Sequence, residues 1–237
     1  MRKTTYIWCA VVLSLFVGSF AVTSMAGNHE QTNVKEKATE DQEKATDQNM
    51  AYLRVSGELA QLAQDSKDAI LMLAAARLEA MAATEEVSRD KTSKSDTAKA
   101  DAESKPERGD LYALAEQYAG TNEALHALIE DSKASGATKT KGRDRGPGST
   151  TTLVFAHDTD VFHVRFNAWE WAEVTVRGDG DTDLDLHVYD ENGNLVDSDI
   201  GGTDVAYCSW IPIRTATFRI EVKNWGSVYN RYRITTN

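Results

Sequence analysis

Residues 178–196, GDGDTDLDLHVYDENGNLV, decide the fold of this chain. Aspartates occupy alternate positions from Asp179 to Asp185, and apolar residues occupy alternate positions from Leu184 to Val188. Side chains point to opposite faces along a strand, so one face carries carboxylates and the other carries leucine and valine. The turn residues at 190–193 then allow the chain to return as a partner strand. The stretch therefore predicts a half-buried β-hairpin with an acidic entry loop.

The rest of the C-terminal region repeats this alternation. Apolar and polar residues alternate in Phe162–Phe166 and again in Phe218–Val222. Short strands separated by turns are typical of a β-sandwich. Strands are predicted near residues 153–156, 161–166, 171–177, 184–189, 194–198, 204–211, 216–223 and 230–235.

These residues also resemble a known family. TDLDLHVYDENGNLV at 182–196, FRIEV at 218–222, Asn224 and the closing YRIT at 232–235 resemble the bacterial pre-peptidase C-terminal domain, over about residues 151–237. The resemblance implies a jelly-roll-like β-sandwich attached to secreted enzymes, often peptidases, where it aids secretion or grips substrate. Some relatives bind calcium and collagen. No peptidase domain is recognised before it in this chain.

The beginning of the chain is typical of an exported protein. Arg2 and Lys3 form a basic start, residues 6–22 form an apolar run, and Ser24-Met25-Ala26 forms a small-x-small cleavage site. Residues 1–26 are therefore predicted to be a secretory signal peptide, with export to the periplasm or the extracellular space. An uncleaved membrane anchor is the alternative.

Charge and cysteine content narrow the classes of partner. Cleavage after residue 26 removes two basic residues and no acidic one, so the formal net charge changes from −11 to −13. An acidic surface repels nucleic-acid phosphates and anionic membranes, so neither is an expected partner of the mature protein. Only Cys208 follows the signal peptide, so the mature chain forms no internal disulfide, and a core position is expected for this residue.

Residues 27–150 divide into helices and polar segments. Residues 27–50 are predicted to be a polar spacer, because they carry too few apolar side chains to form a core. Residues 51–135 are predicted to be a helical region with a disordered spacer at about 88–108, followed by a flexible linker at 136–150. The helical stripe recurs at three-and-four spacing at Leu59, Leu62, Ala69, Leu73, Ala76 and Ala80. Such helices bury their stripes against one another, against the sandwich or by self-association.

The fold class is thus multidomain α and β. A signal peptide and amphipathic helices precede a C-terminal all-β jelly-roll-like sandwich over residues 151–237.

The acidic entry loop is a candidate metal site. Calcium prefers six to eight oxygen ligands, which Asp179, Asp181 and Asp183 could help to supply. The loop is not an EF-hand, because Leu184 stands where that loop requires glycine. The alternative is that these aspartates bind loop backbone or are solvated. Neither interpretation requires a cofactor. Calcium is the cofactor that this pattern of aspartates would allow.

Three tryptophans are candidates for a ligand surface. Trp169 and Trp171 are two residues apart and are expected to share a strand face, and Trp225 lies in a turn beside Gly226. Exposed tryptophan rings stack on sugars or peptides, whereas most tryptophans of a sandwich lie in its core.

The sequence offers no catalytic constellation. It contains neither an H-E-x-x-H zinc motif nor a G-x-S-x-G nucleophile elbow. The expected function is an exported, non-catalytic binding or accessory protein whose sandwich engages extracellular or envelope protein or polysaccharide. The alternatives are an accessory part of a secreted hydrolase system or a degenerate enzyme, and a structural protein of the cell envelope.

Overall fold

The computed structural model describes residues 32–35, 47–94, 110–136 and 147–237. The predicted signal peptide, most of the predicted spacers and residues 137–146 of the linker lie outside these ranges. Residues 32–237 belong to one unit of the chain. Within the described ranges, no helix combines the length and apolar character needed to cross a bilayer.

The described part of the helical region contains α2 (Gln48–Ser66), α3 (Ala69–Met81), α4 (Leu111–Ala119) and α5 (Glu123–Gly136). Helix α2 ends before Lys67, because this residue adopts a left-handed conformation with φ 55°. The Asp68 carboxylate then caps α3 by accepting from the backbone N–H groups of Ile70 and Leu71. Asp110 caps α4 in the same way.

The helices pack around a core of small residues. Buried side chains of α2 and α3 meet those of α4 and α5 at Ala60, Ala63, Met72, Leu73, Ala75, Ala76, Leu111, Ala115 and Ile129. Of the predicted stripe, Ala69, Leu73 and Ala76 are buried in this core. The prediction is wrong at Leu62, which is 53% exposed, and at Ala80, which is also exposed.

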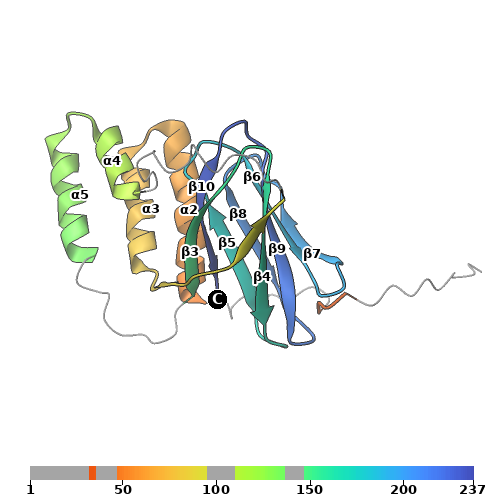
Figure 1. The fold of residues 1–237 in the computed structure, drawn as a ribbon. Coiled ribbons are helices and arrows are strands. Elements are labelled where there is room, and N and C mark those ends of the chain that lie inside the picture. The colour runs from red at the N-terminus through yellow and green to blue at the C-terminus, as the bar shows by residue number, and fades with distance from the viewer. Residues whose placement is uncertain (1–31, 36–46, 95–109, 137–146) are drawn as a thin grey trace, which may run out of the picture. The chain divides into compact units, whose positions relative to one another are not determined.

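Two sheets form the sandwich (Figure 1). Sheet A has the order β1-β3-β10-β5-β8, and sheet B has the order β2-β4-β9-β6-β7. The strands of sheet A are β1 (Glu85–Glu86), β3 (Gly148–Val154), β10 (Asn230–Thr236), β5 (Ala172–Arg177) and β8 (Val205–Trp210). Those of sheet B are β2 (Lys91–Ser93), β4 (Thr159–Phe166), β9 (Ala216–Asn224), β6 (Leu184–Tyr189) and β7 (Leu195–Asp199).

The order of β3 to β10 is that of a jelly roll. Consecutive strands cross from one sheet to the other, except for the hairpin of β6 and β7. Every ladder among these eight strands is antiparallel. Eight strands in two such sheets are the arrangement expected of a double Greek key, so the sandwich predicted from the sequence is present.

The register of β6 agrees with the sequence pattern. Leu184 is 1% exposed, and Leu186 and Val188 are fully buried between the sheets. Leu186 is the register partner of Val222 on β9, which is also fully buried. Cys208 lies in the same core, where burial raises the pKa of its thiol. It is a packing residue, as expected.

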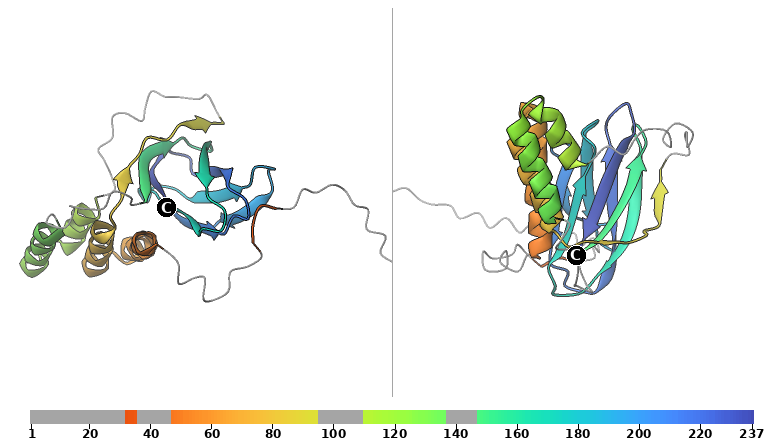
Figure 2. Two further views of the ribbon diagram at one scale, coloured as in Figure 1. Left: turned by 90° about the horizontal axis from the view of Figure 1, so that it is seen from below. Right: turned by 90° about the vertical axis from the view of Figure 1, so that its left-hand side faces the viewer.

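Residues 85–94, which we call the strap, differ from the predicted spacer. β1 pairs in parallel with β3, and β2 pairs antiparallel with β4, so the strap adds one edge strand to each sheet (Figure 2). Lys91 Nζ lies 2.6 Å from the buried carboxylate of Asp160, which also accepts from Ser93 and from the Tyr232 hydroxyl. The polar composition of these residues predicted disorder. The prediction was wrong because the partners that hold these side chains in place, such as Asp160, are distant in the sequence.

A second piece of the predicted spacer is also ordered. Asn33 is fully buried at the end of the sandwich that carries the β6–β7 turn. Its side-chain oxygen accepts from the backbone N–H groups of Ile213 and Arg214, and its own N–H donates to Asp190. Burial would raise the pKa of Asp190, but hydrogen bonds from Asn194 and Asn33 outweigh it and lower that pKa.

Candidate functional site

The predicted tryptophans do not form one surface. Trp169 lies in the β4–β5 turn and is 67% exposed, whereas Trp171 is half-buried and precedes β5, so the two do not share a strand face. Trp225 lies in the β9–β10 loop and is 51% exposed, as expected. β4 separates these two turns, and eight residues of strand span roughly 23 Å.

Each exposed tryptophan has its own surroundings. The Trp225 ring is covered on one face by Lys223, whose Nζ lies 3.2 Å from the ring centroid, and its Nε1 donates to Asp185. Trp169 has φ 65°, in the left-handed region that a side chain of this size rarely adopts. Its backbone N–H donates to the carbonyl of Pro212 at 2.8 Å.

Of the predicted aspartates, Asp179 is bound by backbone N–H groups, whereas Asp183 Oδ1 is buried without a hydrogen-bond partner among the described residues. Asp179 accepts from the backbone N–H groups of Arg231, at 3.2 Å, and Asp181, at 3.4 Å. Burial, together with the charge of Asp181, raises the pKa of Asp179, and burial followed by the charge of Asp185 raises that of Asp183. In the described part of the chain, no three histidine, cysteine, aspartate or glutamate side chains are grouped to hold a metal ion.

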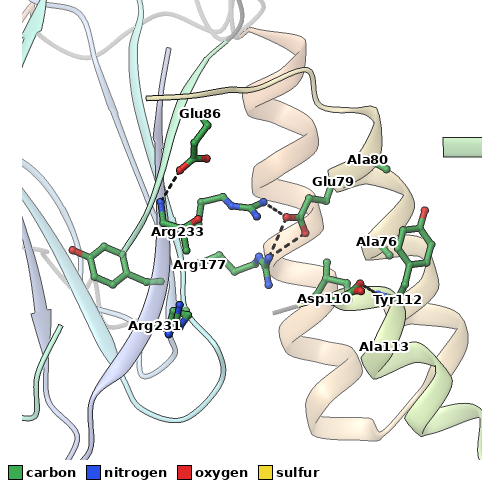
Figure 3. A pocket seen from close by; sticks show the side chains of 14 residues that line it. Ala76, Glu79, Ala80, Glu86, Asp110, Tyr112, Ala113, Arg177, Arg231 and Arg233 are labelled. Carbon is green, nitrogen blue, oxygen red and sulfur yellow. Dashed lines mark hydrogen bonds and ion pairs between the residues drawn. The ribbon is translucent and has the colours of Figure 1, made fainter. Parts of the chain in front are cut away.

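A cleft that the sequence analysis missed lies between the helices and sheet A. Its volume is about 820 Å³, and it is lined by α3, α4, the strap and strands β3, β5 and β10 (Figure 3). The charged side chains of the lining are Glu79, Glu86, Asp110, Arg177, Arg231 and Arg233.

Three arginines converge on this cleft because of strand register. Arg231 and Arg233 are two residues apart on β10, so they share a face of sheet A. Arg177, at the end of β5, is the direct register partner of Arg233. The spacing of Arg231 and Arg233 could have predicted from the sequence that these two side chains share a strand face. The position of Arg177 beside them could not be predicted, because it depends on the pairing of β5 with β10.

Like charges on facing strand positions repel, and Glu79 offsets that repulsion. Arg177 Nη2 lies 3.1 Å from both carboxylate oxygens of Glu79, and Arg233 Nη1 donates to the same carboxylate. Figure 3 shows both guanidinium groups reaching from the strands toward this residue of α3. Glu79 therefore links the helices to the sheet.

The remaining carboxylates of the cleft are engaged elsewhere. Glu86 accepts from the backbone N–H of Thr151 at 3.3 Å, and Asp110 caps α4 through the N–H of Tyr112 at 2.9 Å. Among the described residues, no carboxylate forms an ion pair with the guanidinium of Arg231. This half-buried group consequently offers its hydrogen-bond donors to the cleft.

The cleft continues into a second hollow of about 640 Å³. Both hollows are lined by Asp110 and Ala113 at the beginning of α4, and the second extends along the loop from Asp179 to Asp181 and to Gln64 of α2. We call the two hollows together the junction groove. It runs between the helical region and the sandwich, and its first half carries the arginines.

The side chains of the arginine half are of few chemical kinds. Its lining contains guanidinium, carboxylate and phenol groups beside alanine and leucine, and neither histidine nor cysteine. Among the described residues, His126 on α5 contacts the carbonyl of Gly120, which caps the end of α4, and His187 stacks on Tyr189 of sheet B.

Comparisons with known proteins found similarity to solved structures only. No family model and no curated protein matches this chain. The chain is similar to the pre-peptidase C-terminal domain of a collagenase from Bacillus anthracis, with 12% identity and a TM-score of 0.32, covering 41% of this chain and 100% of that one. It is also similar to a periplasmic inhibitor of g-type lysozyme from Aeromonas hydrophila, with 10% identity and a TM-score of 0.31, covering 41% and 90% of the two chains.

A carbohydrate-binding module of Cellvibrio mixtus lichenase 5A, solved with cellotriose, has 12% identity and a TM-score of 0.26, and the match covers 40% of this chain and 89% of that one. Likenesses of this extent carry no information on the ligand of this protein. The family resemblance read from the sequence therefore stays a prediction.

Proposed function

We propose that this protein is an exported, non-catalytic binding protein that holds a protein or polysaccharide ligand in the junction groove. An anionic group of the ligand is anchored by the arginines of sheet A. Export is an expectation from residues 1–26, and no cofactor takes part. The same groove would serve an accessory role beside a secreted hydrolase.

The size and position of the groove support this proposal. Ligand pockets commonly enclose about 300–1,000 Å³ and occur where two structural units meet. The arginine half has a volume of about 820 Å³ and lies between the helices and the sandwich. Residues from α3, α4, the strap and sheet A all contribute to its lining.

One observation carries the proposal. Three guanidinium groups face one cleft in a chain with a formal net charge of −11, and the single carboxylate of Glu79 pairs with two of them. Concentrating positive charge on one strand face weakens pairing between the strands. Arginine is suited to planar, two-point recognition of carboxylate and phosphate groups. A ligand anion is the remaining partner for Arg231.

The test is capture of the purified protein on supports carrying collagen, peptidoglycan or polygalacturonate. The Arg231→Gln variant removes the available guanidinium. The Arg219→Gln variant is the matched control, because Arg219 lies on sheet B, where it covers the Tyr189 ring at 4.2 Å.

On the support that retains the wild type, we expect Arg231→Gln to weaken retention by about tenfold or more, since hydrogen bonds to charged groups contribute about 1.5–3 kcal/mol. Arg219→Gln should bind as the wild type does. Equal retention of wild type and Arg231→Gln, or no retention on any support, would contradict the proposal.

A further inference from the structure

We infer that the arginine half of the junction groove recognises a peptide carboxylate flanked by small aliphatic side chains. This inference rests on the proposed function and names the class of ligand for the same site. It follows from the local charge, from the alanines of the helical wall and from the lack of an exposed aromatic ring in the lining of the arginine half.

The local charge suits a singly charged group. Three arginines and three carboxylates line the cleft, so their formal charges sum to zero; Glu79 pairs with Arg177 and Arg233, and Glu86 and Asp110 are the two other carboxylates. A dianionic phosphate or a polyanion would meet these two carboxylates and the negative field of the whole chain. A carboxylate carries one charge and matches the planar fork of a guanidinium.

Small apolar side chains line the helical wall of the cleft beside Glu79 and Asp110. They are Ala76 and Ala80 of α3 and Ala113 of α4, all labelled in Figure 3. Ala80 and Ala113 are exposed to the cleft. Alanines leave room for a ligand group, and burial of an aliphatic side chain against them stabilises binding by the hydrophobic effect. A carboxylate next to a methyl or isopropyl group would contact both walls.

The aromatic residues of the lining do not provide a platform for a sugar ring. Tyr232 is 1% exposed, and its hydroxyl donates to Asp160 inside the sandwich. Tyr112 is half-buried and packs against the helical core. Sugar recognition relies on stacking upon exposed planar rings. The exposed tryptophans of the described residues, Trp169 and Trp225, do not line the groove. Tyr118 lines only the second half, where it is half-buried and Lys67 lies over its ring, so the arginine half favours a peptide.

Calorimetric titration of the full protein with defined probes tests the inference. The probes are the acetylated tetrapeptide Gly-Ala-Ala-Ala with a free C-terminal carboxylate, the same peptide as its C-terminal amide, and the acetylated and amidated tripeptide Ala-Asp-Ala. Tetragalacturonate and inorganic phosphate are the comparison anions. The first and third peptides distinguish a terminal carboxylate from a side-chain carboxylate.

We expect at least one carboxylate peptide to bind and the uncharged amide to bind about tenfold more weakly or not at all. Arg231→Gln should weaken the carboxylate peptide by a similar factor, and Arg219→Gln should leave it unchanged. Equal affinity of the carboxylate peptide and its amide, or affinity that Arg231→Gln does not alter, would overturn the inference.

The two proposals fail differently. If tetragalacturonate or phosphate binds in an Arg231-dependent manner and the peptides do not, the groove is a binding site and the ligand class is wrong. If no probe and no captured polymer depends on Arg231, the proposed function fails together with the inference.

Discussion

Arg177 on strand β5 and Glu79 on helix α3 are 98 positions apart in the sequence, and their side chains meet at 3.1 Å through both carboxylate oxygens. Arg233 donates to the same carboxylate from the neighbouring strand. The contact joins the two walls of the junction groove. It also leaves Arg231, on the same face of sheet A, as the guanidinium available to a ligand.

Loss of the Glu79 carboxylate should destabilise the protein. Glu79 and Arg177 are 18% and 16% exposed, so solvent screens their interaction only partly. Glu79→Gln leaves two arginines facing each other across β5 and β10, and we expect the free energy of unfolding to fall by about 1–3 kcal/mol in urea titrations. Glu58→Gln is the control, because its ion pair with Arg54 is exposed and spans 3.9 Å, and it should change stability by less than about 0.5 kcal/mol. Equal effects would mean that Glu79 does not link the walls.

Leu186→Ala tests the register of the sandwich. Leu186 is fully buried, and removal of a buried leucine side chain costs about 2–5 kcal/mol. Leu195→Ala, on the partner strand β7, removes a side chain that is 52% exposed and should cost much less. Thermal and urea unfolding of the two variants give the comparison. A cost below about 1 kcal/mol for Leu186→Ala would contradict the inward-facing register.

The strap should stabilise the sandwich through Lys91. Its ammonium pairs with Asp160, whose side chain is fully buried, so Lys91→Met leaves that carboxylate without its cation. We expect a loss of about 2–4 kcal/mol in the free energy of unfolding. The double variant Lys91→Met with Asp160→Asn should recover part of that loss. If Lys91→Met alone is neutral, the strap does not contribute through this pair.

Glu173 should make stability depend on pH. Burial raises the pKa of this residue, although hydrogen bonds from the Tyr207 hydroxyl and the Asp47 N–H oppose the shift. A raised carboxyl pKa favours the protonated folded state, so its contribution is complete below the ordinary glutamate pKa of about 4.3 and is lost as pH rises through the folded value. The free energy of unfolding of Glu173→Gln relative to wild type should therefore increase from pH 4 to pH 7. A difference that is constant with pH would show that Glu173 does not titrate on folding.

Trp169 should be replaceable without loss of stability. Its φ of 65° costs an L-residue about 1 kcal/mol, and its ring is 67% exposed. Trp169→Gly relieves that strain, so we expect the free energy of unfolding to stay unchanged or to rise by about 0.5–1 kcal/mol. Trp225→Ala, which removes the contacts with Asp185 and Lys223, should be destabilising. Destabilisation by Trp169→Gly of more than about 1 kcal/mol would contradict this account.

The sandwich could be predicted from the sequence because the residue patterns that specify its strands and turns lie within short stretches of the chain. Alternation around Leu186 and the turn at Gly193 specify a hairpin within twenty residues, and the structure places both as expected. The strap and Asn33 could not be predicted in this way. Lys91 and Asn33 are polar residues in polar segments, and their partners Asp160 and Arg214 are 69 and 181 positions away.

The candidate site shows the same contrast. The candidate residues chosen from the sequence were Asp179 with its neighbours and the tryptophans. In the structure the aspartates lie in one loop, and Trp169 and Trp225 lie in two other loops. The arginine half arises only when β10 pairs with β5 and α3 supplies Glu79. Its single local sign was the spacing of Arg231 and Arg233 on the last strand.

The central claim is that the ligand occupies the junction groove, and thiol footprinting tests it most directly. Ala113→Cys places a reactive group on an exposed residue that lines both hollows, and Leu195→Cys is the control on β7. The native Cys208 is fully buried, and burial raises its pKa, so it should not react. The probe is a soluble fragment of whichever polymer retains the protein: a collagen peptide, a peptidoglycan fragment or an oligogalacturonate. At ten times Kd of that fragment, maleimide labelling of Ala113→Cys should slow about tenfold, with Leu195→Cys unaffected. An unchanged labelling rate at position 113 would place the ligand elsewhere and contradict the account.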